Sequence, residues 1–312
     1  MANDHWLGIE LRHLAALDAV AREGSFRRAA TSLGYVQSAI SQQIAALEKS
    51  VGQRLVERSR GGGRLRLTEA GELVLQHAEA ILARLKAAQA DVAALAEGQG
   101  QLRVGITQSV GVRILPELMR RFARDWPDVR LRPTEAPADL ELYEAVERGD
   151  VDLAFVELPV PPGPFEATKL MPDPYVLVVA AGSPLAKKPV ALKDLAGVPL
   201  VGHTECRGLA RVEAQLRSRG LEPDFAFRSD VNATIQALVG AGVGAAVLPA
   251  LAVDPSDELI TMRELPGIPP RVLAVARHRD RYHSQAARAF VEHAQAVCAG
   301  LTSETRKLAA VD

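Results

Sequence analysis

Two stripes of apolar residues with helical spacing lie close together near the start of the chain. The first comprises Phe26, Ala29, Ala30 and Leu33, and the second comprises Ile40, Ile44, Leu47 and Val51. Ser25 precedes the first stripe as a preferred helix N-cap, and Gly34 follows it, where a left-handed residue commonly ends a helix. The pattern therefore predicts two short helices joined by a tight turn.

A third and longer stripe lies within residues 68–97. Its apolar positions alternate at spacings of four and three residues, namely Val74, Ala78, Ile81, Leu85, Ala88, Val92 and Leu95. Thr68 is the expected cap, and at about 1.5 Å per residue the helix would be about 45 Å long. Heptad spacing favours pairing with a second copy of the chain. Packing against the domains of its own chain is the alternative.

Beyond residue 100, predicted strands alternate with predicted helices. Strands are expected at 102–106, 129–132, 149–156, 175–180, 200–201, 225–227, 245–248 and 271–276, and helices at 110–125, 140–148, 209–219 and 284–301. This alternation predicts an open, mostly parallel sheet architecture of the α/β class. Residues 301–312 are expected to form a flexible tail.

The second short helix carries polar side chains between its apolar positions. They are Gln37, Ser38, Ser41 and Gln42, which fall in its first turns. Amide and hydroxyl groups at a helix N-terminus match the base edges in a DNA major groove. The two helices are therefore predicted to be a helix-turn-helix whose second helix reads DNA. An ordinary helical hairpin with a polar outer face is the alternative.

Basic residues gather around this motif, although the whole chain has a net charge of −1. Residues 22–66 contain three acidic residues and nine basic ones, namely Arg22, Arg27, Arg28, Lys49, Arg54, Arg58, Arg60, Arg64 and Arg66. Such an island is the electrostatic footprint of phosphate binding. Arg58, Arg60 and Arg64 flank glycines 61–63, which predicts a DNA-contacting wing. A solvated surface loop is the alternative. Arg27 is a further predicted DNA contact.

Residues 9–68 resemble the N-terminal domain of LysR-type transcriptional regulators. The most specific matches are EGSF at 23–26 with AA at 29–30, Gln37 with Ser41, QI at 43–44, LE at 47–48 and LTEAG at 67–71. Where the family commonly has Ser-Gln-Pro, this chain has Val36-Gln37-Ser38. Val36 cannot cap the helix with its side chain, which leaves backbone N–H groups available to a DNA phosphate. The departure alters the expected base contacts, not the fold.

Residues 101–300 resemble the effector domain of the same family, which has the two-lobed fold of periplasmic binding proteins. The more specific segments are 114–131 and 149–156. The resemblance implies lobe I at 101–161 and 270–300 and lobe II at 164–266, with crossings at the proline-rich segments 161–164 and 266–270. It also implies that the helix at 68–97 is a dimerising linker.

Polar residues at the ends of predicted strands mark a candidate effector site. They are Thr107, Gln108 and Ser109 after the first strand, His203 and Thr204 after the strand at 200–201, and Asp230 and Asn232 before a helix, with Glu157 added. Each group alone is more often a helix cap than a ligand contact. In a two-lobed sheet fold, however, the carboxyl ends of strands line the ligand crevice. Together these residues predict a cleft for a small polar molecule.

Other chemistry is disfavoured by the pattern of motifs. The glycines at 240, 242 and 244 follow a predicted helix and precede a strand, which reverses the order of a dinucleotide fingerprint. His203, Glu205 and Cys206 have no second cluster at metal-ligand spacing, so no metal site is predicted. Cys206, near His203 and Arg207, could be a redox-active thiol, although an ordinary cysteine is favoured.

Composition sets broad limits on the class of protein. The 312 residues, 48% hydrophobic and 24% charged, suit a soluble protein of about two domains. No stretch approaches the roughly 18 apolar residues of a membrane span, and the first residues lack the pattern of a signal peptide. The two cysteines, Cys206 and Cys298, lie far apart and indicate no disulfide framework. The sequence therefore predicts a cytoplasmic protein that does not enter a membrane.

These inferences predict an α/β protein with an N-terminal all-α winged helix-turn-helix and a two-lobed, periplasmic-binding-protein-like effector domain. We expect a transcriptional regulator, with no enzymatic activity or cofactor, that binds a double-stranded DNA operator and a small-molecule effector. A homodimer or homotetramer is expected, with RNA polymerase as a further candidate partner. The competing class is a solute-binding or enzymatic α/β protein with an accessory helical domain. The missing signal peptide and catalytic constellation disfavour it.

Overall fold

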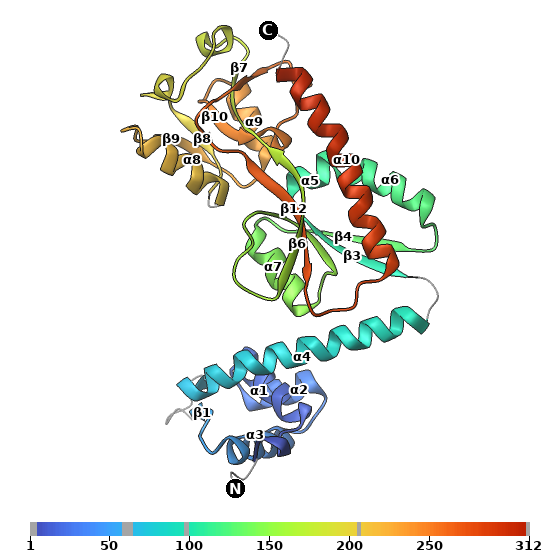
Figure 1. Cartoon of the computed structure of the whole chain (residues 1–312). Helices are drawn as coiled ribbons and strands as arrows, with labels where there is room; N and C mark the ends of the chain where they lie inside the picture. Colours follow the sequence, from blue (N-terminus) through green and yellow to red (C-terminus); the bar gives the residue numbers. More distant parts are fainter. Residues whose placement is uncertain (1–4, 58–64, 97–99, 205–206, 310–312) are drawn as a thin grey trace. The chain divides into compact units, whose positions relative to one another are not determined.

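A computed structural model describes residues 5–309 except 58–64, 97–99 and 205–206. The chain folds into two compact units, one formed mainly by residues 1–93 and the other mainly by residues 94–312 (Figure 1).

The first unit is a small helical domain with a two-stranded hairpin. Its elements are η1 (His5–Gly8), α1 (Leu11–Glu23), α2 (Phe26–Leu33), α3 (Gln37–Val51), β1 (Val56–Glu57), β2 (Arg66–Leu67) and α4 (Glu69–Ala96). The two helices predicted from the apolar stripes are present, and Gly34 ends α2 with a φ of 71°. Ser25 occupies the N-cap of α2, but its side chain makes no capping hydrogen bond.

The hairpin and α4 are tied to the helical core by buried contacts. The stripe residues Ala29, Ile40 and Ile44 are buried in one apolar cluster with Leu55 and Val74. The carboxylate of Glu48 on α3 accepts the N–H groups of Leu55 and Val56 at 2.8 and 3.2 Å. These bonds fix the position of the hairpin relative to α3.

Thr68 and Gly71 fix the start of α4. The Thr68 hydroxyl accepts the N–H of Gly71 at 3.0 Å and donates to the Arg54 carbonyl at 2.7 Å. A Cβ at position 71 would lie 2.1 Å from the Leu55 carbonyl oxygen, so this position requires glycine. The predicted cap at Thr68 is therefore present.

The second unit contains two lobes. Lobe I is a five-stranded sheet of order β4-β3-β5-β12-β6, built from β3 (Gln101–Ile106), β4 (Arg130–Glu135), β5 (Leu153–Glu157), β6 (Phe165–Asp173) and β12 (Arg271–His278). Helices α6 (Leu115–Asp125) and α10 (Gln285–Ala309) pack on one face of this sheet (Figure 1). The ring of Phe122 on α6 packs edge-on against that of Phe290 on α10. Residues of α7 (Asp139–Arg148) pack into a separate apolar cluster with Val156 and Ala274.

Lobe II has an antiparallel sheet of order β10-β7-β11 and a parallel pair, β8-β9. Its elements are β7 (Tyr175–Ala180), η2 (Pro184–Lys187), η3 (Leu192–Leu195), β8 (Leu200–Gly202), α8 (Arg207–Arg217), β9 (Phe225–Arg228), α9 (Asn232–Gly240), β10 (Ala246–Pro249), η4 (Ala250–Ala252) and β11 (Ile260–Glu264). Two apolar clusters fill the lobe, one around Leu177 and one around Val178, because alternate residues of β7 face opposite sides of the sheet.

The predicted lobe boundary at 161–164 is wrong. Residues 165–173 form β6, which pairs with β12 from Phe165↔His278 to Arg271↔Asp173 and therefore belongs to lobe I. The chain crosses into lobe II between Asp173 and Tyr175. The return crossing falls between Glu264 and Arg271, as predicted.

Three further expectations differ from the structure. The architecture is not mostly parallel: the lobe I sheet is mixed, because β12 runs antiparallel to both β5 and β6, and the β10-β7-β11 sheet is antiparallel. The helix predicted at 110–125 is two helices, α5 (Gln108–Arg113) and α6, since the backbone breaks at Ile114 and Pro116 takes a first-turn position of α6. The predicted tail is helical as far as Ala309, because α10 continues through it.

Candidate DNA interface and effector cleft

The first turns of α3 present a polar surface opposite a buried face. Ile40 and Ile44 are buried, whereas Gln37, Ser38 and Gln42 are exposed and Ser41 is partly exposed. Side chains that alternate in this way on one helix leave the polar set accessible to a partner. This arrangement can offer amide and hydroxyl groups to base edges.

Val36 is the N-cap of α3, with an extended backbone and no side-chain capping bond. Its carbonyl accepts the N–H of Ala39 at 3.0 Å, which starts the helix. The valine side chain is 68% exposed.

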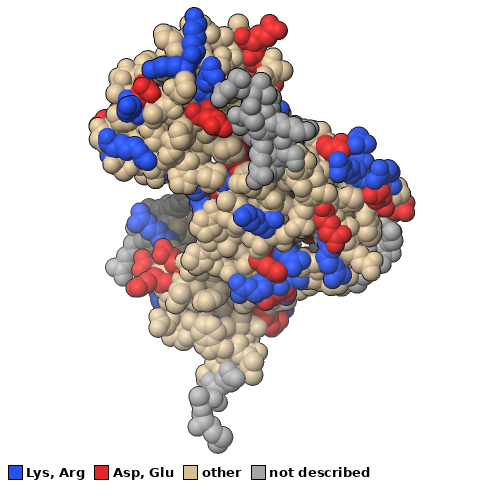
Figure 2. All heavy atoms as spheres, turned by 45° about the horizontal axis from the view of Figure 1, so that its top comes forward, with Lys and Arg blue, Asp and Glu red and all other residues tan. Residues whose placement is uncertain are grey.

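The arms of the predicted wing are present as the antiparallel pair β1 and β2, in the register Val56↔Leu67. Arg58, Arg60 and Arg64 lie outside the described residues. Arg27 is exposed on α2. On the face shown in Figure 2, by contrast, Lys and Arg side chains stand among Asp and Glu side chains. The basic surplus at 22–66 is therefore a local feature of a chain whose net charge is −1.

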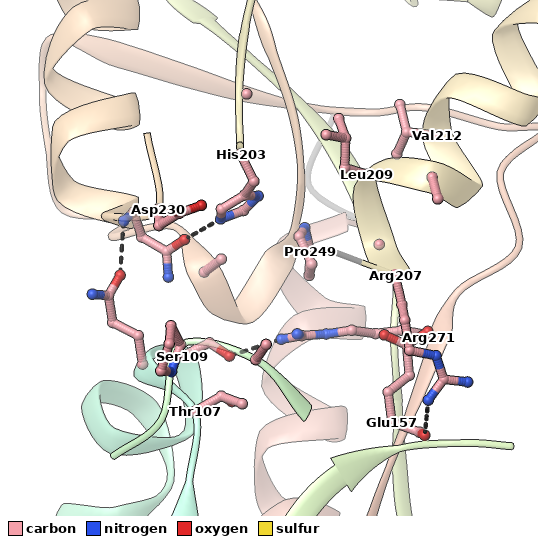
Figure 3. Close-up of a pocket in the computed structure, with 18 of the residues that line it drawn as sticks. Thr107, Ser109, Glu157, His203, Arg207, Leu209, Val212, Asp230, Pro249 and Arg271 are labelled. Carbon is pink, nitrogen blue, oxygen red and sulfur yellow. Dashed lines mark hydrogen bonds between the residues drawn. The ribbon is translucent and has the colours of Figure 1, made fainter. Parts of the chain in front are cut away.

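A cavity of about 470 Å³ lies between the two lobes. Lobe I contributes Thr107, Gln108, Ser109, Asp139, Glu157 and Arg271, and lobe II contributes His203, Arg207, Asp230 and Asn232 (Figure 3). Apolar side chains, including Leu200, Leu209, Val212 and Phe225, line the rest. Seven of the eight predicted effector residues line this cavity, and Thr204 does not; its backbone N–H donates to the Asp230 carboxylate at 3.1 Å.

A chain of hydrogen bonds connects the lobes on one side of the cavity (Figure 3). The side-chain oxygen of Gln108 accepts the Asn232 N–H at 2.7 Å. Nε2 of His203 lies 2.9 Å from Oδ1 of Asn232, which requires the tautomer protonated on Nε2. Three predicted residues, at the start of α5, directly after β8 and at the start of α9, are thereby joined.

Arg271, at the start of β12, was not predicted as a site residue. Its Nε donates to Asp173 at 2.8 Å and its Nη2 donates to the Ser109 hydroxyl at 2.9 Å (Figure 3). Asp173 is buried and also accepts the N–H of Leu251 in lobe II at 3.1 Å. These residues stand at the crossings between the lobes, and a signal existed in the sequence, because Arg271 directly follows the predicted crossing segment 266–270.

Contacts from α8 to lobe I, which we term the interlobe latch, connect the lobes on the other side of the cavity. Arg207 donates to the carbonyls of Glu157 and Pro159 at 3.0 and 2.9 Å, and Arg211 forms an ion pair with the buried Glu157 carboxylate. Burial raises the pKa of the nearby Asp139 carboxyl group, and the negative charge of Glu157 adds to this rise. The backbone N–H of Glu157, which donates to Asp139 at 2.8 Å, lowers the pKa but does not cancel the rise. The latch residues other than Glu157 were missed, since their positions depend on how the lobes meet.

The cavity can hold a small molecule with polar groups at the Ser109–Arg271 side and apolar atoms near Leu209. Within the described parts of the chain, no cluster of three or more His, Cys, Asp or Glu side chains could hold a metal ion. The cluster of His203, Glu205 and Cys206 considered above falls partly outside those residues. None of the described helices is long and apolar enough to cross a membrane.

Fold and site together define a helix-turn-helix DNA-binding domain joined to a two-lobed ligand-binding domain. The profile of the lysR-family bacterial regulatory helix-turn-helix protein matches residues 11–72, and that of the LysR substrate binding domain matches residues 95–299. The chain belongs to the LysR family of transcriptional regulators.

Relatives and solved structures match this chain over most of its length. An uncharacterized HTH-type transcriptional regulator, YnfL, of Escherichia coli (strain K12) is 33% identical over 78% of this chain and 83% of its own length. A probable RuBisCO transcriptional regulator of Cyanophora paradoxa is 30% identical over 97% of this chain and 96% of its own. The structure of full-length CbnR complexed with its target DNA is 26% identical, with a TM-score of 0.63, and the match covers 92% of this chain and 99% of CbnR.

Proposed function

We propose that this LysR-type regulator binds a specific DNA operator through α3 and the wing, and that an effector in the interlobe cavity controls its action. The cavity is the observation that carries the proposal. It is built from both lobes, and seven residues expected from the sequence alone line it.

The DNA contacts divide into two kinds. Gln37, Ser38, Ser41 and Gln42 are proposed to meet base edges, since short polar side chains at the start of a recognition helix reach the major groove. Arg27, Arg58, Arg60 and Arg64 are proposed to contact phosphates or the minor groove, which position the protein without reading sequence. The basic surplus within residues 22–66 supports this assignment.

The effector is proposed to contact Thr107, Gln108, Ser109 and Glu157 of lobe I with His203, Asp230 and Asn232 of lobe II. Thr204 would act only through its backbone bond to Asp230. A ligand that touches both lobes favours one arrangement of the lobes over another, which is the differential affinity that a switch requires. The interlobe latch and the Gln108–Asn232 bond are the contacts that such a change would alter.

The assembly is proposed to be a homodimer or homotetramer formed through α4. Ile81, Leu85 and Val92 of the predicted stripe are exposed in the single chain, whereas Val74 and Ala78 are buried in the first unit. We place the protein in the cytoplasm, with RNA polymerase as a candidate partner, and assign it no catalysis of its own, because the family consists of regulators.

A ligand screen with cleft variants tests the effector site. The thermal stability of the full-length protein is measured against a panel of small organic acids, amino acids and sugars. A compound that raises Tm and alters operator binding should lose both effects in Ser109→Ala and Asn232→Ala. Full retention of both effects in both variants would show that the effector binds elsewhere.

A further inference from the structure

Val36 has a side chain that neither caps its helix nor packs in the core. It occupies the N-cap of α3 with φ −85° and ψ 151°, and it is 68% exposed. Ser, Thr, Asp and Asn are preferred at an N-cap because their oxygen accepts a free backbone N–H of the first turn. Valine gives up this stabilisation, and so neither helix stability nor burial accounts for it.

The surroundings of Val36 point to DNA. It directly precedes Gln37 and Ser38, which are exposed on the proposed base-reading surface. The chain around it has a basic surplus. An isopropyl group offers nothing to a phosphate, which needs a hydrogen-bond donor or a positive charge. Among the groups that bases present in the major groove, the C5-methyl of thymine is the apolar one.

We propose that Val36 is a specificity-determining residue that packs its isopropyl group against the C5-methyl group of a thymine in the operator. The proposal rests on the proposed role of α3 as the recognition helix. In this arrangement the amide and hydroxyl groups of α3 supply hydrogen bonds to bases, and Val36 supplies the apolar contact at the helix start. Local helix stability is given up for base discrimination, as is common at functional positions.

The contact predicts a dependence on one methyl group of the DNA. Full-length protein first selects its preferred duplex from a random-sequence pool. The thymines of that duplex are then replaced by deoxyuridine one at a time, and the affinity for each singly substituted duplex is measured. Loss of one methyl contact at one position should weaken wild-type binding about four-fold, which corresponds to about 0.8 kcal/mol for one buried CH₂-sized group.

Variants at position 36 connect that methyl group to this side chain. In Val36→Ser the deoxyuridine penalty should vanish, and in Val36→Thr, which keeps one methyl, it should be smaller than in wild type. Both hydroxyl variants can cap α3, so their Tm should be equal to or above that of wild type, which separates lost contact from lost folding. Val112→Ser is the matched control, because Val112 is 66% exposed on α5 in the other unit, and it should keep the wild-type penalty.

Two results would overturn the proposal. Either no single thymine-to-deoxyuridine change weakens wild-type binding, or the penalty is the same in wild type and Val36→Ser. Gln37→Ala, measured on the same duplex, distinguishes failure of the valine contact from failure of the assignment of α3 as the recognition helix. If Gln37→Ala weakens binding while Val36 shows no coupling, α3 still reads the DNA and only the valine contact is wrong; if neither variant matters, the assignment of α3 fails as well.

Discussion

We propose that single side chains on α3 determine which DNA sequence this regulator binds. Gln37 and Gln42 are both exposed and each offers an amide that can both donate and accept. On this proposal, removing either amide would leave a base edge without its hydrogen-bond partner. We expect Gln37→Ala or Gln42→Ala to lower affinity for the operator by about 1–3 kcal/mol and to relax base preference at one position.

The measurement is a quantitative shift assay on the selected operator and on single-base variants of it. Gln101→Ala, an exposed glutamine at the start of β3, is the matched control and should bind as wild type. Unchanged affinity and selectivity in both α3 variants would remove these residues from the base-reading set.

Cys298 illustrates how burial determines the reactivity of a residue. Burial raises the pKa of its thiol to about 12, so that at pH 8 the group stays protonated and lacks the reactive thiolate. In a Cys206→Ser variant we therefore expect no thiol to react with a disulfide reagent in the native protein, and one to react after unfolding in guanidinium. Reaction of the native variant at the rate of a free cysteine would contradict this.

At the scale of elements, the sequence predicted best where one apolar face determines the periodicity. Helices α2 and α3 match the predicted stripes because their buried and exposed positions follow a single helical period. Strand β7 has the predicted range because it is a short apolar run, buried from Tyr175 to Val179. Strand β6 was missed, since its sequence FEATKLMPD mixes exposed polar and buried residues and follows a proline-rich segment that resembled a linker. Its pairing with β12, about a hundred residues later, fixes it as a strand, and local pattern does not contain that information.

The exposed stripe of α4 should determine the oligomeric state. Leu85 is 48% exposed in the single chain and lies in register with Ile81 and Val92. In a symmetric pair, Leu85→Asp would remove a leucine from both copies, each worth about 1.5–3 kcal/mol when buried. We expect the dimer Kd to rise at least about a hundred-fold in sedimentation velocity.

Lys86→Asp is the control for this substitution, because it places the same carboxylate on the neighbouring exposed position of the helix. It should leave the dimer Kd within a few-fold of wild type. If Leu85→Asp dimerises as tightly as wild type, the stripe is not the interface.

The interlobe latch should stabilise the second unit. In Glu157→Gln the Arg211 guanidinium would lose the carboxylate of its buried ion pair. Breaking a buried pair costs about 3–5 kcal/mol, and we expect the lower end because Arg211 is partly exposed. Calorimetry should show a lower Tm. Glu166→Gln, which removes an exposed partner of Arg277, should cost less than about 1 kcal/mol; equal effects of the two substitutions would contradict a latch.

At the scale of the whole molecule, the candidate site shows which of its residues can be predicted from the sequence alone. Strand ends and helix starts are local features, and so Thr107, Ser109, His203 and Asn232 were predicted and line the cavity. Arg207 and Arg271 reach it through contacts between segments 48 to 162 residues apart in the chain. Such contacts depend on how the two lobes meet, which no local pattern specifies.

Sequence-specific DNA binding is the property that defines this chain as a regulator. The direct measurement is the affinity of the full-length protein for its selected operator and for a scrambled duplex of equal length, at several salt concentrations. We expect the operator to bind at least about a thousand-fold more tightly, and the logarithm of the affinity for both duplexes to fall linearly with the logarithm of the salt concentration. Equal affinity for operator and scrambled DNA, or binding that does not change with salt, would contradict sequence-specific DNA binding by this chain.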